Sequence, residues 1–434
     1  MTGARAAGPV ATLDERGRIV EEAQLCAEPV SGARRATPIA CAEPAKLAAA
    51  YSEALRGGDC PLVLSAQLSA EARHAVAEAA KGELPGPGHL LCTSGTTSKA
   101  PKVYFVPLDA ALGNAQAHLQ SLGMDSSDER ILLPMSMSHS FGLVAAALGS
   151  AVLGARLLAF RATPDPATLL QTTAAERVTT LYLIPPLLRL LLRRLRRRPA
   201  PALPELRRIS VGSAPVTRAE LAELAEHIPG VRITFTYGLT ELGPRVSTYV
   251  LVEGAAARAS DAALPIGEPI DDVELEVREP GELYVRSPWA AAGRWLDGKL
   301  SPIAGDDGFV ATGDAARREG ESIYLGGRRD GVIVMGGGNV YPEDLERVAD
   351  GTDGVAASCA LGRASAVYGE VPILAVELVE GADEAAVLRD LRERLQARLS
   401  PSHMPVEIQR ISLPRTAAGK VARAAARAAL LETA

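Results

Sequence analysis

The segment CTSGTTSKAPK, from Cys92 to Lys102, places hydroxyl groups and a glycine directly after an apolar run and ahead of two lysines. Backbone N–H groups around Gly95, together with the hydroxyls of Ser94, Thr96 and Thr97, can surround phosphate oxygens. The spacing GxxxxGKS/T of P-loop nucleotidases is absent, which excludes that class. On these residues alone, a phosphate-holding loop and a polar linker both remain open.

Further polar, glycine-containing segments follow in order along the chain. They are SVGSAPV at Ser210–Val216, YGLTE at Tyr237–Glu241, TGD at Thr312–Asp314, GRRDGVIVMGGGNVYPEDLE at Gly327–Glu346 and PRTAAGKVAR at Pro414–Arg423. Together with TSGTT they resemble the acyl-adenylate-forming superfamily, which includes acyl-CoA synthetases, aryl-acid ligases and nonribosomal adenylation domains. The resemblance covers roughly residues 90 to 425. One such motif is weak evidence, whereas six in the same order are specific.

The resemblance implies roles for residues of the first half of the chain. The loop over the β- and γ-phosphates of ATP would be Thr93, Ser94, Gly95, Thr96 and Thr97, with Lys102 at its end. The adenine would be lined by Gly212, Ser213, Ala214 and Pro215. Tyr237 would pack on the nucleotide beside Gly238, Thr240 would contact the α-phosphate, and Glu241 would hold Mg²⁺.

The resemblance also implies roles near the C-terminus. Asp314 would accept hydrogen bonds from the ribose hydroxyls, and Arg328 would lie near the same sugar. Lys420 would bridge the substrate carboxylate and ATP, and Asp330 would be a hinge. These residue types suit the chemistry, because a carboxylate that attacks the α-phosphate brings two anions together. Lys420 and Mg²⁺ can supply the positive charge that the transition state needs.

Three other basic features each allow two interpretations. His139, in LPMSMSHSFGL, either lines the acyl pocket and gates the second substrate, as a histidine often does in the family, or packs in the core at a strand–helix junction. Arg245 either pairs with a second carboxylate or polar group of the substrate, or is a solvated or structural arginine. The run Arg193–Arg198 is either an exposed helix end or a contact for CoA phosphates or an acidic carrier protein.

Two departures from the family pattern bear on function. In the usual form TSGTTGxPKG a glycine stands where this chain has Ser98, and one extra residue precedes Pro101. Serine adopts positive φ less freely than glycine, so we expect a stiffer or displaced loop tip and a weaker grip on pyrophosphate. The portion before the loop is shorter than in typical members, so part of the acyl pocket wall or a dimer surface would be missing or supplied by a partner.

The elements that must position these residues alternate in type from about residue 89 onward. Apolar runs predict strands at 89–94, 129–134, 155–160, 178–184, 206–211 and 231–236. Helices are predicted at 108–123, 142–154, 185–197 and 217–227. This alternation indicates an α/β fold with layered, doubly wound sheets. Residues 1–88 give weak signals and are assigned loosely to the same domain.

The pattern of the sequence changes after about residue 272. Short strands separated by Gly, Pro and Asp turns predict a β-rich subdomain. A smaller α+β domain should follow, with a helix PEDLERV, strands near VAASCALG and PILAVELV, and an amphipathic helix carrying Leu388, Leu391, Leu395 and Leu399 on one face. We therefore predict a large adenylation domain over residues 1–327 and a small mobile domain over 328–434 that carries the lysine.

Composition narrows the class of protein. The chain has 434 residues, 47% hydrophobic and 23% charged, with a net charge of −6, which fits a globular protein and argues against a nucleic-acid binder. No apolar run is long enough to span a bilayer, and the N-terminus does not read as a secretory signal. Five scattered cysteines indicate neither a disulfide framework nor a zinc site, so a cytoplasmic location is expected.

The sequence thus predicts an ATP- and Mg²⁺-dependent ligase that converts a small carboxylic acid to an acyl-adenylate. The acyl group would then pass to CoA, a carrier-protein phosphopantetheine or an amine, in a monomer or homodimer without a nucleic-acid or membrane partner. The alternatives are a nucleotide-binding pseudoenzyme that serves as a scaffold, and an adenylating enzyme that acts on a non-carboxylate oxyanion. Neither the acid nor the acceptor is identified by the residues.

Overall fold

The computed structural model describes residues 6–28, 34–66, 68–93, 102–251, 264–331, 333–335, 338–365, 369–399, 404–416 and 419–431. The chain folds into two compact units. The first holds most of the chain up to Ala311, and the second holds Val277–Leu283 and the chain from Thr312 onward. The predicted boundary between residues 327 and 328 remains a prediction.

The first unit is built on a nine-stranded sheet whose six central strands are parallel. In spatial order the strands are β13 (Glu268–Pro269), β12 (Ser247–Val250), β11 (Arg232–Tyr237), β10 (Arg208–Gly212), β9 (Thr180–Leu183), β7 (Arg130–Leu133), β8 (Arg156–Phe160), β1 (Ala6–Leu13) and β2 (Ile19–Ala27). Strands β2, β12 and β13 pair antiparallel at the two edges. The central strands are apolar on both faces, as a doubly covered parallel sheet requires.

A second, six-stranded sheet completes the framework of this unit. Its order is β17 (Lys299–Ser301), β16 (Gly293–Leu296), β6 (Lys102–Pro107), β5 (Gly88–Thr93), β4 (Cys60–Leu64) and β3 (Ala36–Ala40). Strands β3, β4 and β5 are parallel, and β5 and β6 form an antiparallel hairpin. The hairpin matters for function because the predicted phosphate loop connects these two strands.

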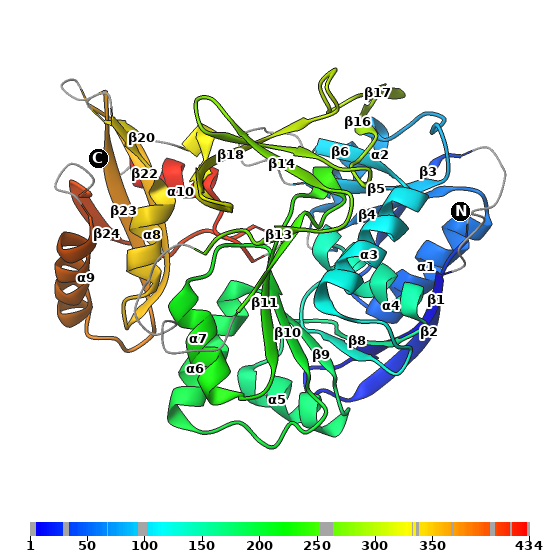
Figure 1. The fold of residues 1–434 in the computed structure, drawn as a ribbon, viewed down its shortest axis with the longest axis horizontal. Helices are drawn as coiled ribbons and strands as arrows, with labels where there is room; N and C mark the ends of the chain where they lie inside the picture. The colour runs from blue at the N-terminus through cyan, green and yellow to red at the C-terminus, as the bar shows by residue number, and fades with distance from the viewer. Residues whose placement is uncertain are drawn as a thin grey trace. The chain divides into compact units, whose positions relative to one another are not determined.

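Helices fill three layers around the two sheets. Between the sheets lie α1 (Pro44–Arg56), α3 (Leu108–Leu122), the π-helix η1 (Phe141–Leu148) and α4 (Gly149–Leu153), which share one apolar core with both sheets (Figure 1). The other face of the large sheet is covered by α5 (Pro166–Ala175), α6 (Pro185–Arg197) and α7 (Arg218–His227). Helix α2 (Ala70–Ala79) packs on the outer face of the small sheet.

Local chemistry explains where these helices begin and which face they bury. Helix α7 begins at a capping box, in which the Thr217 hydroxyl accepts from the Glu220 N–H and the Glu220 carboxylate accepts from the Thr217 N–H. In α6 the leucines at 187, 188, 191, 192 and 195 recur with helical spacing and are all buried, while its arginines face outward.

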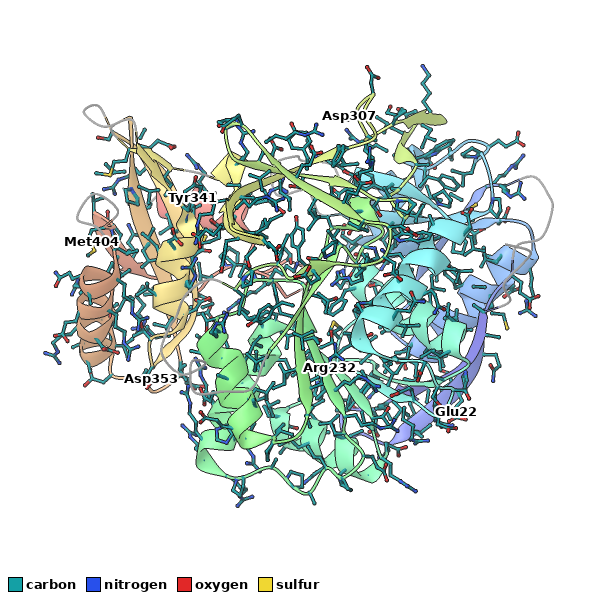
Figure 2. The ribbon with its side chains drawn as sticks, in the orientation of Figure 1. Glu22, Arg232, Asp307, Tyr341, Asp353 and Met404 are labelled. Carbon is teal, nitrogen blue, oxygen red and sulfur yellow. The ribbon has the colours of Figure 1, made fainter. Side chains whose placement is uncertain are left out.

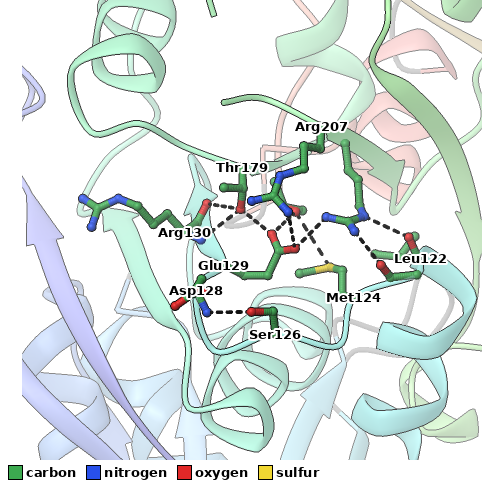
Figure 3. Close-up of polar contacts among 11 residues, drawn as sticks. Leu122, Met124, Ser126, Asp128, Glu129, Arg130, Thr179 and Arg207 are labelled. Atoms are coloured by element: carbon green, nitrogen blue, oxygen red, sulfur yellow. Dashed lines mark hydrogen bonds and ion pairs between the residues drawn. The ribbon is translucent and has the colours of Figure 1, made fainter. Parts of the chain in front are cut away.

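The amino-terminal edge of the parallel strands is held by the buried carboxylate of Glu129 (Figure 3). This carboxylate accepts from Arg208 Nη1 at 2.7 Å and from the hydroxyls of Thr179 and Thr180. A cavity of about 260 Å³ lies beside this network, lined by Asp128, Arg130, Arg177, Thr179, Glu205 and Arg207. In open α/β sheets, ligands bind at the opposite, carboxyl-terminal edge. We therefore treat the Glu129 network as structural.

The carboxyl-terminal edge has a topological switch point at β7. The connection from β7 to β8 runs through η1 and α4 on one face, whereas β8, β9, β10 and β11 are linked through α5, α6 and α7 on the other face. Such a reversal opens a crevice where the first connection leaves the sheet. The segment that leaves β7 contains His139.

The second unit contains a small α+β body. Its sheet has strands β21 (Gly338–Val340), β20 (Ile333–Met335), β23 (Gly369–Leu378) and β22 (Val355–Ser365), with β24 (Glu407–Arg410) paired to β23. Helices α8 (Pro342–Asp350) and α9 (Glu384–Arg398) pack with β23 in one core, and α10 (Arg423–Leu431) packs with β22 and β23 in another. Leu391 and Leu395 are fully buried and Leu388 and Leu399 are partly buried, which confirms the predicted apolar face.

A third sheet has four strands, the last two of which pair antiparallel. Its strands are β14 (Glu274–Arg278), β15 (Glu282–Arg286), β18 (Val310–Glu319) and β19 (Ser322–Arg328). These are the short strands that the turn-rich sequence predicted. Nearby, Tyr341 precedes α8 (Figure 2), and its ring lies close to Gly326 of β19.

The predicted α/β class with layered sheets and a smaller second domain is confirmed. All six predicted strands and the helices α3, α6 and α7 form within a few residues of their expected bounds. One difference is the segment 142–154, which folds as a π-helix followed by a short α-helix. Strands β1 to β4 and helices α1 and α2 fill the region that gave weak signals. No helix in the described ranges is long and apolar enough to cross a membrane.

Candidate active site

The segment GSAP leaves the carboxyl end of β10 in a tight turn. Gly212 is buried, and a Cβ there would lie 2.7 Å from Thr236 Oγ1 and 3.1 Å from the Phe141 ring. Ser213 follows with φ of 80°, a conformation that non-glycine residues seldom adopt. Ala214 is half-buried and Pro215 is exposed. A backbone in this unusual shape at a sheet's carboxyl edge is typical of functional sites.

The YGLTE segment leaves the neighbouring strand β11. Tyr237 ends the strand and is buried. A Cβ on Gly238 would lie 1.7 Å from the Pro244 carbonyl oxygen, so only glycine fits this close approach. Thr240 and Glu241 then begin a 3₁₀ turn, Thr240–Leu242, with both side chains half-buried.

The third segment is the one that leaves β7 at the switch point. His139 is half-buried between β7 and η1, at the strand–helix junction that the sequence indicated. The next residue, Ser140, shares a hydrogen bond of 2.9 Å between its Oγ and Thr240 Oγ1. The predicted nucleotide and acyl segments, 100 residues apart in sequence, therefore meet at one edge of the sheet.

The ends of the predicted phosphate loop also lie close together. Thr93 is the last residue of β5 and pairs with Lys102, the first residue of β6. Lys102 is half-buried. The side chain of Thr93 and the predicted loop residues Ser94, Gly95, Thr96 and Thr97 lie outside the described residues, as does Ser98.

Arg245 is not solvated. Only 3% of its surface is exposed, and its guanidinium lies over the Phe141 ring, with Cζ 4.4 Å from the ring centroid. Its Nη1 donates to Thr236 Oγ1 at 2.9 Å. Burial lowers the pKa of Arg245 to about 10, so the side chain remains a cation at neutral pH.

The motifs did not indicate the residues that hold Arg245. Asn114 of α3 fixes its backbone, because Nδ2 donates to the Arg245 carbonyl at 2.7 Å and Oδ1 accepts from the Arg245 N–H at 2.9 Å. His118, one turn later, binds Tyr182 through Nε2 at 3.1 Å. A signal existed in the sequence: Asn114 and His118 are polar residues at i and i+4 on the apolar face of a predicted helix.

In the second unit, Asp314 and Arg328, which were both predicted to lie near the ribose, form an ion pair. They stand opposite each other in β18 and β19, and Arg328 Nη1 lies 3.2 Å from Asp314 Oδ1. The same Nη1 donates to the Thr312 carbonyl at 2.7 Å. The Asp314 side chain is 10% exposed, whereas that of Arg328 is 44% exposed. An oriented carboxylate of this kind can accept hydrogen bonds from two adjacent hydroxyls.

Lys420 lies in an exposed turn ahead of α10. The Thr416 N–H donates to the Lys420 carbonyl at 2.7 Å, and Arg415 and Val421 form an isolated β-bridge around the turn. Gly419 precedes the lysine with φ of 75°, a value that favours glycine. The backbone is therefore constrained on both sides of the lysine.

An ion pair attaches this turn to α8. Arg423 Nη2 lies 2.6 Å and 2.5 Å from the two carboxylate oxygens of Glu346, and its Nη1 donates to the Ala360 carbonyl. Burial raises the pKa of the Glu346 carboxyl, and the charge of Arg423 opposes that rise. Glu343, on the same helix, also accepts from the Arg328 N–H at 3.4 Å. Helix α8 therefore contacts both the Lys420 turn and the Asp314–Arg328 pair.

The predicted hinge residue, Asp330, belongs to the 3₁₀ turn Arg329–Gly331 that follows β19. Arg329 forms an ion pair with Glu282 next to this turn. Asp330 lies inside the second unit, in the segment of that unit that runs from Thr312 onward. Its role as a hinge stays a prediction.

The fold, with these segments gathered at the carboxyl edge and a separate unit that carries an exposed lysine, is that of an adenylate-forming ligase. Residues 54–295 match the family of AMP-binding enzymes, and residues 344–420 match the C-terminal domain of AMP-binding enzymes. The chain belongs to the AMP-binding enzyme family.

The similar proteins include two ligases. An indoleacetate–CoA ligase from Aromatoleum aromaticum is 31% identical over 76% of this chain and 65% of its own length. A medium/long-chain-fatty-acid–acyl-carrier-protein ligase from Mycobacterium tuberculosis is 29% identical over 60% of this chain and 51% of its own length. The chain thus spans less than two thirds of the length of these relatives.

Solved structures agree in fold. The anthranilate CoA ligase AuaEII in complex with anthranoyl-AMP has a TM-score of 0.79 at 16% identity, covering 93% of this chain and 89% of its own. The amide bond synthetase McbA from Marinactinospora thermotolerans has a TM-score of 0.74 at 20% identity, covering 92% of this chain and 89% of its own.

Proposed function

We propose that this protein activates a carboxylic acid with ATP and then transfers the acyl group. In the first step a carboxylate oxygen bonds to the α-phosphorus while the bond from that phosphorus to the bridging oxygen breaks, releasing pyrophosphate. In the second step a thiol or amine attacks the acyl carbon, and AMP leaves with the oxygen that linked it. The observation that carries the proposal is the hydrogen bond between Ser140 and Thr240, which joins the segment after β7 to the YGLTE segment in a chain of the AMP-binding family.

The residues of the first unit would bind the nucleotide. The backbone of the turn Gly212–Pro215 would line the adenine, and the Tyr237 ring would pack on the nucleotide. The Thr240 hydroxyl would donate to an α-phosphate oxygen, and the hydroxyl-rich loop after Thr93, ending at Lys102, would hold the pyrophosphate. Hydroxyl and amide donors suit a leaving group that must also be released.

Glu241 fits a Mg²⁺ ion by the chemistry of its neighbourhood. Its half-buried carboxylate follows the Thr240 hydroxyl, and both are hard oxygen donors. The described residues include no group of three or more acidic, histidine or cysteine side chains that could hold a metal. Mg²⁺ is commonly bound through one or two carboxylates together with substrate phosphates, and Glu241 would be such a carboxylate. The ion would neutralise charge that develops on the phosphates.

In the second unit, Asp314 would accept from the ribose hydroxyls with Arg328 orienting its carboxylate, and Lys420 would donate to the reacting carboxylate and the α-phosphate. The acceptor would be CoA, a carrier-protein phosphopantetheine or an amine. Support comes from relatives whose names include CoA ligase, acyl-carrier-protein ligase and amide bond synthetase.

The test is acid-dependent exchange of labelled pyrophosphate into ATP with a broad panel of carboxylic acids. We expect exchange with at least one acid in the presence of Mg²⁺, and AMP release once CoA, a carrier protein or an amine is added. Nucleotide binding without exchange across the panel would instead support a pseudoenzyme. Formation of an adenylate from a non-carboxylate oxyanion would instead support an adenylating enzyme that acts on such an anion.

A further inference from the structure

Arg245 is a buried cation whose charge no carboxylate balances among the described residues. Its polar partners there are the Thr236 hydroxyl and the face of the Phe141 ring, and its Nε has no hydrogen-bond acceptor. Other arginines with little exposure behave differently: Arg208 pairs with Glu129, and Arg423 pairs with Glu346. A buried charge is normally paired, because desolvation of an unpaired ion is costly.

The surrounding residues make room for this arginine and fix its position. A Cβ on Gly212 would lie 3.2 Å from Arg245 Nη1, so the missing side chain leaves space for the guanidinium. Asn114 holds the Arg245 backbone through two hydrogen bonds, and Asn114 is itself fully buried. These contacts orient the cation without neutralising it.

More unsatisfied polar atoms lie on the same face of the sheet. Ser210 and Gly212 of β10 are in register with Thr234 and Thr236 of β11, so their side chains project from one face. Ser210 is fully buried, and its Oγ has no partner among the described residues. His118 Nδ1 is likewise buried without a partner there, while its Nε2 binds Tyr182, which pairs with Ser210 across β9 and β10.

These atoms lie next to the proposed acid-activating site. Phe141, under the guanidinium, directly follows Ser140, which binds Thr240, and Arg245 follows Glu241 by four residues. We propose that Arg245 binds a second carboxylate of the substrate, so that the acid activated by this enzyme is a dicarboxylic acid. The inference rests on the proposed function.

The geometry favours a carboxylate over a neutral group. Nη1 is engaged by Thr236, which leaves the edge that carries Nε to donate to an oxygen pair, the side-on arrangement in which arginine binds carboxylates. The Ser210 hydroxyl and His118 Nδ1 are further polar groups on this face that have no partner among the described residues. A monocarboxylic acid with an alkyl tail would leave Arg245 Nε, the Ser210 hydroxyl and His118 Nδ1 without hydrogen-bond partners and away from water. The free-energy cost of unpaired polar groups is what allows a hydrogen-bonding site to reject a substrate analogue.

The experiment compares dicarboxylic acids with monocarboxylic acids of the same chain length, such as adipate with hexanoate, over a series of chain lengths. Pyrophosphate exchange is measured in the wild type, Arg245→Met and Arg245→Lys. We expect the wild type to prefer one dicarboxylate over its matched monocarboxylate by about 100-fold or more in kcat/KM. Arg245→Met should abolish most of that preference, and Arg245→Lys should retain part of it.

Unfolding separates this role from a structural one. Because Arg245→Met removes an unbalanced buried charge, its Tm should equal or exceed that of the wild type. Arg208→Met, the matched control, removes the nearer of the two arginines beside the buried Glu129 carboxylate and should lower Tm. A lowered Tm for Arg245→Met with an unchanged acid preference would overturn the proposal.

Ligand binding provides a readout that does not need turnover. The preferred dicarboxylate, with AMP present, should raise the Tm of the wild type and leave that of Arg245→Met unchanged. If no acid supports exchange but dicarboxylates still give this Arg245-dependent shift, the proposed function fails and the binding inference stands. Exchange with monocarboxylates only, or equal shifts for both acid classes, would refute the inference while leaving acid activation intact.

Discussion

Among single residues, Lys420 carries the most specific chemical expectation, because its exposed ammonium group is the proposed contact to the reacting carboxylate. We predict that Lys420→Ala lowers adenylate formation by about two to four orders of magnitude, since the cation stabilises charge only in that step. Transfer from a supplied acyl-adenylate to the acceptor should be largely spared. Single-turnover assays of the two half-reactions measure both effects.

Lys299, an exposed lysine of β17, offers a matched control. Lys299→Ala removes the same charge from the molecule, so it should leave both half-reactions within about twofold of the wild type, as expected for a surface change. An equal fall of both half-reactions in Lys420→Ala would mean that the lysine has a structural role or serves both steps.

At the scale of elements, the position of the Lys420 turn depends on the pairing of α10 with α8. We predict that Arg423→Met lowers the free energy of unfolding of the second unit by about 3 kcal/mol, because it leaves the buried Glu346 carboxyl without its partner. Adding Glu346→Met should recover most of that loss, since two apolar side chains can replace a buried ion pair. Chemical denaturation of the single and double variants checks this.

Arg427 lies on the exposed side of the same helix and provides the control, because Arg427→Met should change stability by less than about 0.5 kcal/mol. If the double variant recovers stability but not adenylate formation, the ion pair positions the lysine as well as stabilising the fold. A double variant as unstable as Arg423→Met would show that Glu346 is not the group that Arg423 compensates.

The elements differ in how well the sequence predicts them, and the reason is physical. Helix α6 and strands β9 to β11 carry strong apolar periodicity, and they form where that pattern places them. Strand β1, with the sequence AAGPVATL, has little strand propensity of its own and exists because it pairs with β8 on one side and β2 on the other. Such pairing is a tertiary effect that local pattern does not contain.

The candidate site shows the same limit. Segments such as YGLTE and GSAP were recognisable because their residue types are tied to a chemistry. The hydrogen bonds between Asn114 and Arg245 join residues 131 positions apart, so no local pattern indicates that one fixes the other. The sequence also does not tell whether Arg245 is solvated. Its burial in the fold shows that it is not.

For the whole molecule, two buried histidines contribute to the response to acid. Burial lowers the pKa of His89 to about 4, and burial together with the charge of Arg245 lowers that of His118 to about 3, against an unfolded value of about 6.5. Both are therefore neutral in the fold, and the unfolded chain binds more protons below pH 6.5. The contribution of these two histidines to the free energy of unfolding should be constant above that pH and fall toward pH 4 by up to about 1.4 kcal/mol per pH unit for each histidine.

Denaturant unfolding between pH 7.5 and 4 measures this slope. The variant His89→Gln keeps a polar side chain beside Tyr51 and should reduce the number of protons taken up on unfolding by about one, which makes the slope shallower. His74→Gln, on the exposed surface of α2, should leave the slope unchanged. An unchanged slope in His89→Gln would assign the acid sensitivity to other groups.

The two half-reactions also require a conformational change of the chain, because the lysine that serves adenylate formation must move away before the acyl acceptor can bind. We predict that Asp330→Pro uncouples the two steps, since proline fixes φ and restricts the preceding residue at the proposed hinge. Adenylate formation and acyl transfer should then differ in their loss by about tenfold or more. Asp330→Ala, which keeps the backbone free, should leave their ratio unchanged.

The location of Asp330 makes this test discriminating. It lies in the turn Arg329–Gly331, inside the segment of the second unit that runs from Thr312 onward. If the chain pivots at Asp330, β18 and β19 would stay with the bound nucleotide and keep Asp314 and Arg328 in place. Helix α8 and Lys420 would move. If Asp330→Pro retains both half-reactions at wild-type rates, the pivot must lie elsewhere. The point near Thr312, where the chain passes from the first unit into the second, would then be the next position to restrict, and the ribose contact at Asp314 would have to move together with the lysine.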